Sequence, residues 1–355
     1  MHKSAAAPMF LPTAEARAIG TKLLDRYALP KVAMALILIS TAAGAWLSLL
    51  GIGAAQVDLA LAKWAHFLAL SIVLGGSLWG AFFSRLRYQE QDIETPVPFL
   101  LREYSRFMAI QRYATLVGLL AGLYIAARYA SLFVERSVSW YATLLGLQVA
   151  LWLGLAVVVL VGSGLPRDTG DSWLPRTQRW LKVIALVAAG SLLTMAALDV
   201  VPQTGADAPV ILIRWLHLSA FGAWFGGAVW NVFVAVPAAR ETLCFETIFA
   251  AASQLEQFRK VVRLALPLVL LSGLYQSYRW VGLDISALLG LPVGLIIVLK
   301  VGLIATLVGI FIACPMWRAC SPIAGVCDIT DIDPTPSGVE REAQTGDSAP
   351  ARCHS

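Results

Sequence analysis

Charge is scarce in this sequence, and the scarcity limits the classes of protein to which the chain can belong. Only 14% of its 355 residues are Asp, Glu, Lys or Arg, whereas 58% are hydrophobic. Soluble globular domains contain roughly 25% charged residues, so the composition argues against a water-soluble protein and indicates a chain in a lipid bilayer. The apolar–polar alternation that membrane β-barrels require is also missing, which leaves membrane-spanning helices.

Motifs of nucleotide binding and hydrolysis are missing as well. The chain contains no P-loop, no dinucleotide-binding fingerprint and no G-x-S-x-G. We therefore expect neither ATP-driven pumping by this chain alone nor hydrolytic chemistry, and we predict that the protein is not an enzyme. Residues 1–30 also lack an apolar core followed by a small-residue cleavage site, so we expect no cleavable signal peptide.

Cysteines are few and fall in the last third of the chain. Their spacing does not match the paired C-x-x-C pattern of zinc sites. The topology predicted below places them on the cytoplasmic side, where thiols stay reduced, so we expect no structural disulfide. A loose thiol and thioether cluster after the last helix could bind Cu(I), but a chance cluster is the favoured interpretation. The cysteines are Cys244, Cys314, Cys320, Cys327 and Cys353.

Long apolar runs are what the sequence has instead of charge. A helix needs about 20 apolar residues to cross ~30 Å of hydrocarbon, and eight runs are close to that size. We therefore predict an all-α polytopic membrane protein with eight transmembrane helices. The predicted spans are 32–53, 64–84, 107–127, 141–163, 183–200, 213–236, 261–281 and 292–314.

The positions of Lys and Arg predict how these helices are oriented. Most of them lie before the first span and around the second, fourth and sixth connections. Because positive residues collect on the cytoplasmic side, both termini are predicted inside. The net charge of +5 is then a topology signal, and we predict no nucleic-acid partner. The opposite connections are expected to hold only Lys63, Arg128, Arg136, Arg214 and Arg279.

The sequence repeats itself at an offset of 151 residues. Trp64-Ala65-His66 returns as Trp215-Leu216-His217 (217 − 66 = 151), and Gly75-Gly76 returns as Gly226-Gly227. Each unit has four spans, so the two units are predicted to be parallel repeats related by an axis along the membrane normal. The predicted divisions are a basic cytoplasmic leader (1–30), a first four-helix repeat (31–163), a cytoplasmic linker (164–181), a second four-helix repeat (182–314) and a disordered cytoplasmic tail (315–355).

His66 and His217 are the leading candidates for a metal site. Both lie near the outer ends of predicted helices, and Trp224 and Asn231 follow His217 on the same face. We expect two central helices that each present a histidine toward the pseudo-twofold axis, an arrangement that suits copper or haem iron. The alternative is that each histidine only bonds to a neighbouring helix, and duplication favours the metal interpretation.

Two Tyr–Arg pairs lie at outer helix ends. Tyr124 and Arg128 are four residues apart, as are Tyr275 and Arg279, so each pair shares a helix face. One interpretation is an interfacial anchor made of a tyrosine and a snorkelling arginine. The other is an electropositive outer rim that holds an acidic partner protein or haem propionates. The sequence leaves both open.

Three residues of the second unit have no counterpart in the first. Met195 is a candidate Cu(I) ligand, although a flexible packing residue is the favoured interpretation. Asp199 lies one turn further along the same helix. Lys300 lies well inside the last predicted helix, where it needs a partner or a water-filled cavity, and Asp199 is the candidate partner.

A series of short motifs in the second unit resembles a known family. It opens with Arg214-Trp215-Leu216-His217-Leu218 and Trp224-Phe225-Gly226-Gly227, continues with Phe258-Arg259, Leu266-Pro267 and Leu271-Ser272-Gly273-Leu274-Tyr275, and ends with Leu299-Lys300-Val301-Gly302-Leu303. In order and spacing the series resembles the CopD family of copper-resistance membrane proteins. The first unit resembles a diverged copy without the lysine. The resemblance implies copper handling in a bacterial inner membrane, often beside a periplasmic copper-binding protein.

Two functions remain open besides a plain membrane scaffold. In the first, the protein transports copper or serves copper homeostasis, with the two histidines and Met195 as ligands and with Asp199, Lys300 and Asn231 as polar groups along the path. In the second, it is a b-type haem protein in electron transfer, with the histidines as axial ligands and the two outer arginines near the propionates. The motifs favour copper.

Overall fold

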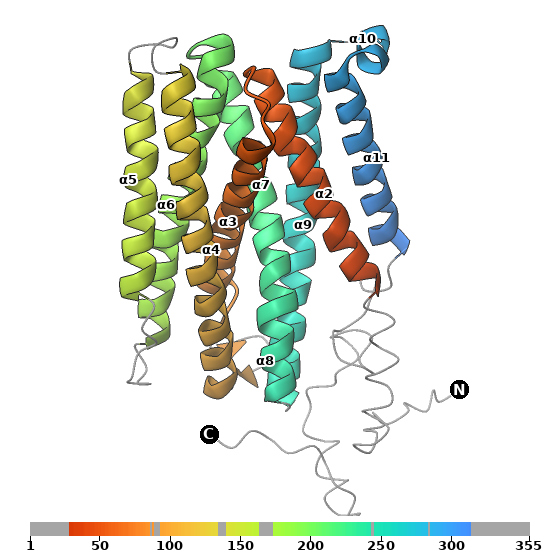
Figure 1. Ribbon diagram of the computed structural model, residues 1–355. Helices are drawn as coiled ribbons and strands as arrows, with labels where there is room; N and C mark the ends of the chain where they lie inside the picture. Colours follow the sequence, from red (N-terminus) through yellow and green to blue (C-terminus); the bar gives the residue numbers. More distant parts are fainter. Residues whose placement is uncertain are drawn as a thin grey trace, which may run out of the picture.

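The computed structural model describes residues 28–85, 87–88, 93–133, 140–162, 173–242, 245–282 and 285–313. These residues form a helical bundle with one short pair of antiparallel strands (Figure 1). Most of the predicted leader, the predicted tail and all five cysteines lie outside the described residues.

The helices alternate in direction through the bundle. In the orientation of Figure 1, the upper end holds the connections 52–56 and 205–207, and the lower end holds the strand pair. The elements in chain order are α2 (Ala28–Gly51), α3 (Val57–Phe82), β1 (Arg87–Tyr88), β2 (Ile93–Glu94), α4 (Val97–Phe133), α5 (Tyr141–Gly162), α6 (Trp173–Thr204), α7 (Ala208–Val229), the π-helix η1 (Trp230–Ala235), α8 (Val236–Glu241), α9 (Phe245–Val281), α10 (Ile285–Gly290) and α11 (Pro292–Ala313).

Seven of the helical segments within the described ranges are long and apolar enough to cross a membrane. They overlap seven of the eight predicted spans and fit an all-α polytopic membrane protein. The remaining predicted span, 261–281, lies in α9, whose 37 residues also carry Arg259, Lys260, Arg263 and Arg279. The eighth span therefore stays a prediction.

Two helices begin earlier at the upper end than the apolar runs predicted. α3 begins at Val57 and α7 at Ala208, so Lys63 and Arg214, which we expected in connections, lie inside helices. The start of α7 is set by Asp207, whose carboxylate accepts a hydrogen bond from the Val210 backbone N–H. The predicted positions of these two cations are wrong because both helices begin several residues before their apolar runs, and side-chain capping accounts for the early start of α7 alone.

The lower ends of α4, α6 and α9 are extended in the same way. α6 begins at Trp173 and buries both Trp173 and Leu174, so the predicted linker 164–181 is wrong over its last nine positions. α4 likewise begins at Val97 and buries Phe99 and Leu100. These turns are amphipathic rather than wholly apolar, and a search for membrane-length apolar runs does not find them.

α3 and α7 meet backbone to backbone at the centre of the bundle. A Cβ atom on Gly75 would lie 2.2 Å from the Gly222 carbonyl oxygen, and one on Gly226 would lie 2.5 Å from the Ser71 carbonyl oxygen. The contact is reciprocal, because residues 71 and 222 and residues 75 and 226 are each separated by 151. Small residues permit this close approach of two helices.

The helices around this central pair are arranged unequally. α5 packs against both α4 and α6, whereas α11 packs against α2 and contacts α9 only sparsely. An apolar cluster that includes Ile37, Trp224, Val262 and Leu307 still joins α2, α7, α9 and α11. The second side of the bundle is thus less tightly closed around its central helix than the first.

Candidate functional site

A buried cluster of charges lies between α3, α6 and α7. The Asp199 carboxylate on α6 forms ion pairs with Lys63 of α3 and Arg214 of α7, and the side chains of Asp199 and Lys63 are fully buried. The Arg214 Nε lies 3.0 Å from Asp199 Oδ2. The Tyr129 hydroxyl donates to Asp199 Oδ1 over 3.0 Å and accepts from Lys63 Nζ over 2.8 Å. Two cations therefore share one carboxylate in the interior of the bundle.

Sequence reasoning missed this cluster although the signal was present. Lys63 and Arg214 are separated by the repeat offset of 151 and directly precede the repeated Trp-x-His. The predicted pairing of Asp199 with Lys300 is wrong, because both carboxylate oxygens of Asp199 are already bonded to these cations. The Lys300 amine lies beside α2 instead, where a Cβ atom on Gly44 would be 3.1 Å from Nζ.

The two histidines are held in the same way at one ring nitrogen. His66 Nδ1 lies 3.0 Å from the Gly118 carbonyl oxygen, and His217 Nδ1 lies 3.1 Å from the Val269 carbonyl oxygen. Residues 118 and 269 are also separated by 151. A backbone carbonyl needs a donor, so each Nδ1 carries the proton and each Nε2 presents its lone pair.

The second ring nitrogen distinguishes the two histidines. His66 is fully buried, and its Nε2 accepts a hydrogen bond from the Trp152 indole over 3.2 Å. His217 is partly buried, its Nδ1 also lies 3.0 Å from Ser272 Oγ, and no residue in the described ranges bonds to its Nε2. Of these two histidines, His217 is therefore the one whose second ring nitrogen has no protein partner in the described ranges.

The expectation that both histidines face the pseudo-twofold axis is wrong. Each histidine precedes the glycine of the α3–α7 contact by nine residues (75 − 66 and 226 − 217), which is two and a half helical turns. The imidazoles therefore lie on the sides of α3 and α7 that face away from the contact. His66 packs against Gly122 of α4 and His217 against Gly273 of α9, so the structure does not bring them together.

Met195 and Asn231, two further candidates, have local partners. Met195 is 1% exposed and packs in an apolar cluster with Leu49, Leu198 and Tyr129. Asn231 lies in η1 and donates to the Gly227 carbonyl oxygen one turn earlier over 2.8 Å. Both side chains fill interior space, and neither lies in a group of polar ligands.

The outer Tyr–Arg residues mostly bond to the starts of neighbouring helices. Tyr124 donates to Asp58, and Arg128 donates to Gln56, the residue that precedes α3. Arg279 lies 3.5 Å from Asp207, the residue that precedes α7. These contacts suit the anchoring interpretation.

A second polar cluster lies deep in the lower half of the bundle. The Gln254 amide donates to Glu103 Oε1 over 2.9 Å and accepts from the Trp230 indole over 2.9 Å. Residues 103 and 254 are again separated by 151, so the bond joins equivalent positions of α4 and α9. Glu103 is fully buried, and its Oε2 has no hydrogen-bond partner in the part of the chain that the structure describes. Both positions fell outside the predicted spans, which is why sequence reasoning missed them.

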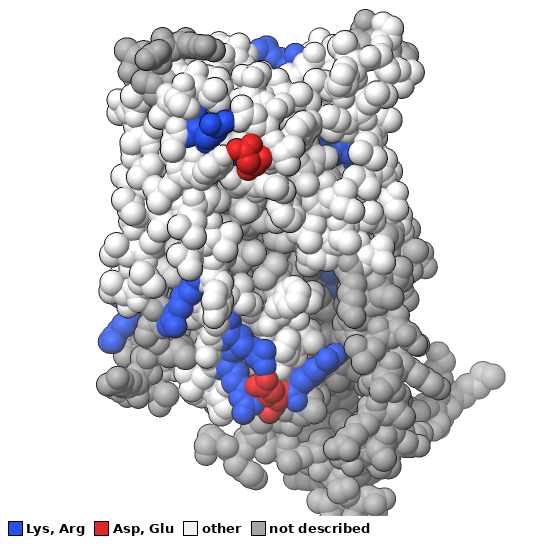
Figure 2. Space-filling view, in the orientation of Figure 1, with Lys and Arg blue, Asp and Glu red and all other residues white. Residues whose placement is uncertain are grey.

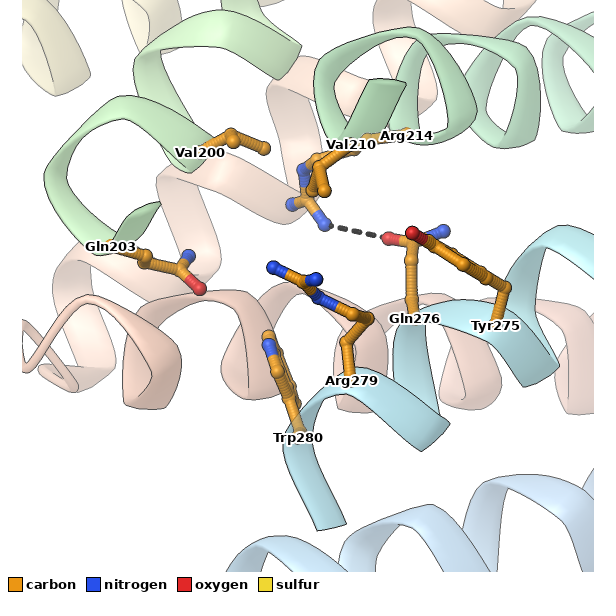
Figure 3. Close-up of a pocket in the computed structure, with 8 residues that line it drawn as sticks. All are labelled: Val200, Gln203, Val210, Arg214, Tyr275, Gln276, Arg279 and Trp280. Atoms are coloured by element: carbon orange, nitrogen blue, oxygen red, sulfur yellow. Dashed lines mark hydrogen bonds between the residues drawn. The ribbon is translucent and has the colours of Figure 1, made fainter. Parts of the chain in front are cut away.

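One small pocket opens at the upper end beside the charge cluster, and Figure 3 shows it in close-up. Its volume is about 30 Å³. Arg214 and Arg279 both turn their guanidinium groups into it (Figure 3). We call it the upper pocket, and its lining residues are Val200, Gln203, Val210, Arg214, Tyr275, Gln276, Arg279 and Trp280.

Within the described ranges, no group of three or more His, Cys, Asp or Glu side chains could hold a metal ion. A metal in this part of the chain would therefore rely on fewer protein ligands or on ligands of other types. No protein-family model matches the chain, and searches of curated proteins and of solved structures found no match.

Proposed function

We propose that the protein is a copper-handling transport protein of a bacterial inner membrane, with eight spans in two parallel four-helix units. Side-chain contacts that recur at the 151 offset support two equivalent units. The Trp64 indole donates to the Leu38 carbonyl, and the Trp215 indole donates to the Ala189 carbonyl at the equivalent position. The recurring histidine–carbonyl bonds and the reciprocal Gly75–Gly226 contact support the same proposal.

The orientation proposed for the bundle rests on its surface charge. Lys and Arg gather toward the lower end on the face drawn in Figure 2. Arg102 and Arg106 at the start of α4 reach Glu241 at the end of α8 there. With positive residues on the cytoplasmic side, the lower end is inside, and the upper pocket opens outside.

His217 carries the proposal for copper as the cargo. Histidines that bind metals nearly always donate their other ring N–H to a carbonyl or a similar acceptor, which orients the ring. His217 does so through Val269, and its Nε2 is left without a partner in the described ranges. The motif series that resembles the CopD family runs through this histidine. We therefore assign cargo binding to His217 of the second unit.

The surroundings of His217 favour brief binding over tight storage. Lys300 and Arg214 are the cations within electrostatic range of the imidazole. They weaken the binding of a metal cation, and conduction requires sites from which an ion can leave. A haem shared by the two histidines is not supported, because Trp152 occupies the His66 nitrogen and the rings contact different helices.

Copper binding by matched histidine variants tests this proposal. In detergent-purified protein, His217→Ala should lose Cu(I) binding measured by competition with a chromogenic chelator. His66→Ala should keep the binding stoichiometry and lose thermal stability, because its ring only joins protein groups. A visible spectrum of the same samples checks for haem. Equal loss of copper in both variants, or a Soret band that either substitution removes, would overturn the assignment to His217.

A further inference from the structure

The upper pocket brings two like charges together. The guanidinium groups of Arg214 and Arg279 are both turned into it (Figure 3). Arg214 is bonded to Asp199 and, over 3.1 Å, to Gln276 Oε1. Among the residues that the structure describes, Arg279 has one ion-pair partner, the partly exposed Asp207, at 3.5 Å. Facing cations repel each other, and the repulsion is stronger at a low-dielectric site than in water.

The charges around the pocket do not balance. Lys63, Arg214 and Arg279 contribute three positive charges, and their ion-pair partners Asp199 and Asp207 contribute two negative ones. An uncompensated charge inside a membrane protein is costly, and such charges usually pair or mark a binding site. One further negative charge would neutralise this group of residues.

The pocket also has donors without acceptors. The described ranges contain no hydrogen bond to the Tyr275 hydroxyl or the Trp280 indole, both of which line the pocket. The Gln276 side chain is fully used, because its carbonyl accepts from Arg214 and its amide donates to the Ser272 carbonyl over 3.2 Å. The Tyr275 hydroxyl and the Trp280 indole thus add two donors to the guanidinium groups, while the Gln203 amide donates to the Asp199 carbonyl over 2.7 Å and leaves its own carbonyl oxygen as an acceptor beside them.

The equivalent place in the first unit is filled. Subtracting 151 from each lining residue leads to eight residues, five of which belong to a closed apolar core: Leu49, Ile52, Leu59, Ile125 and Tyr129. Ile125 replaces Gln276 there, and Leu59, which replaces Val210, is fully buried. The full equivalent set is Leu49, Ile52, Leu59, Lys63, Tyr124, Ile125, Arg128 and Tyr129.

We propose that the upper pocket binds an oxyanion group that is bridged by Arg214 and Arg279. The negative charge of this group neutralises the excess positive charge of the Lys63–Asp199–Arg214 cluster. Guanidinium groups bind such oxygens through paired, charge-assisted hydrogen bonds. The volume of about 30 Å³ admits one small group and not a whole cofactor. The group is therefore a small carboxylate from solution or the head of an anionic lipid that enters from the membrane surface. This site is independent of copper and of His217.

The probe for the soluble source is acetate, with acetamide as the uncharged control of similar shape. Full-length protein in neutral detergent, free of copper and phosphate, is titrated with acetate at constant ionic strength while its unfolding midpoint is measured. A ligand that binds only the folded state raises the midpoint in a saturable manner. Acetate should do so, and acetamide should not. For the lipid source, the unfolding midpoint of the protein in phosphatidylcholine nanodiscs is compared with its midpoint in nanodiscs that also contain phosphatidylglycerol.

Arg279→Gln is the decisive variant, because Arg279 is partly exposed and its loss leaves the buried cluster intact. It should weaken the apparent affinity for the probe that binds by about tenfold or more, as expected for the loss of a charge-assisted bond. Arg128→Gln, the matched change in the first unit, should leave the response unchanged, and so should His217→Ala. No saturable response to either probe, or equal weakening by the two arginine variants, would refute the site.

Discussion

The equivalent histidines of the first and second units have different surroundings. Both ring nitrogens of His66 are hydrogen-bonded, Nδ1 to the Gly118 carbonyl and Nε2 to the Trp152 indole. His217 has the equivalent carbonyl bond at Nδ1 but no partner for Nε2 in the described ranges. Above His66 the core is filled, and above His217 lies the upper pocket. The comparison shows that a repeated motif can be structural in one unit and available for binding in the other.

A few replacements account for this difference. Trp152 of α5, which donates to His66, has Leu303 of α11 at the equivalent position, and leucine has no N–H to donate. Gln276 similarly replaces Ile125 beside the pocket. In addition, α11 contacts α9 only sparsely, while α5 packs against α4. The residues around the motif, and not the motif itself, thus determine whether the histidine Nε2 has a protein partner in the described ranges.

The charge cluster is the point at which the two units depend on each other, and breaking it should have the largest effect. Asp199 has only Ser48 as its counterpart, yet it pairs with the equivalent cations of both units. Asp199→Asn should lower the free energy of unfolding by about 3–5 kcal/mol, because two buried cations lose their carboxylate. Denaturant unfolding in mixed micelles measures the change.

Two controls separate this effect from a general loss of charge. Lys63→Gln leaves one arginine on one carboxylate, so its cost should be clearly smaller than that of Asp199→Asn. Asp207→Asn removes an acid whose side chain is 30% exposed, and such a pair contributes less than about 1 kcal/mol. If Asp207→Asn matched Asp199→Asn, the buried cluster would not be the element that joins the units.

The glycines that face the two histidines allow the two units to be compared directly, and their substitution should destabilise the protein less than loss of Asp199. A Cβ on Gly122 would lie 2.8 Å from the His66 ring, and one on Gly273 would lie 3.3 Å from the His217 ring. Gly122→Ala should cost about 1–3 kcal/mol, since His66 is fixed by Trp152 and cannot move aside. Gly273→Ala should cost less, because His217 has room to shift. Thermal unfolding of the two variants compares them directly, and equal costs would mean that His217 is held as firmly as His66.

The sequence was sufficient to predict an all-α protein with membrane-spanning helices. Apolar runs located seven of the segments that can cross a membrane, and the repeated glycine pairs include Gly75 and Gly226 of the α3–α7 contact. Apolar composition and small-residue spacing are local properties of a chain, so they can be read without a structure. Helix ends are less visible, because capping residues such as Asp207 extend a helix beyond its apolar part.

The polar partners could not be predicted in the same way. Whether Asp199 pairs with Lys63 or with Lys300 depends on which helices pack against α6, and that is a property of the whole bundle. Nor did the repeat reveal which way His66 and His217 face, although counting nine residues from the glycines would have done so. The offset pairs Lys63 with Arg214 and position 103 with position 254, and a search for paired polar types would have found both.

The Glu103–Gln254 bond, which joins equivalent positions, should show the smallest effect when it is made symmetric. Glu103→Gln keeps the oxygen that accepts from Gln254 and changes only the Oε2 side, so the free energy of unfolding should change by less than about 1 kcal/mol. Glu103→Leu should cost about 1–3 kcal/mol, because the Gln254 amide loses its acceptor in a buried site. Denaturant unfolding of both variants tests whether the acceptor oxygen alone matters. A Glu103→Gln variant as unstable as Glu103→Leu would show that the acid itself, through Oε2, is required for stability.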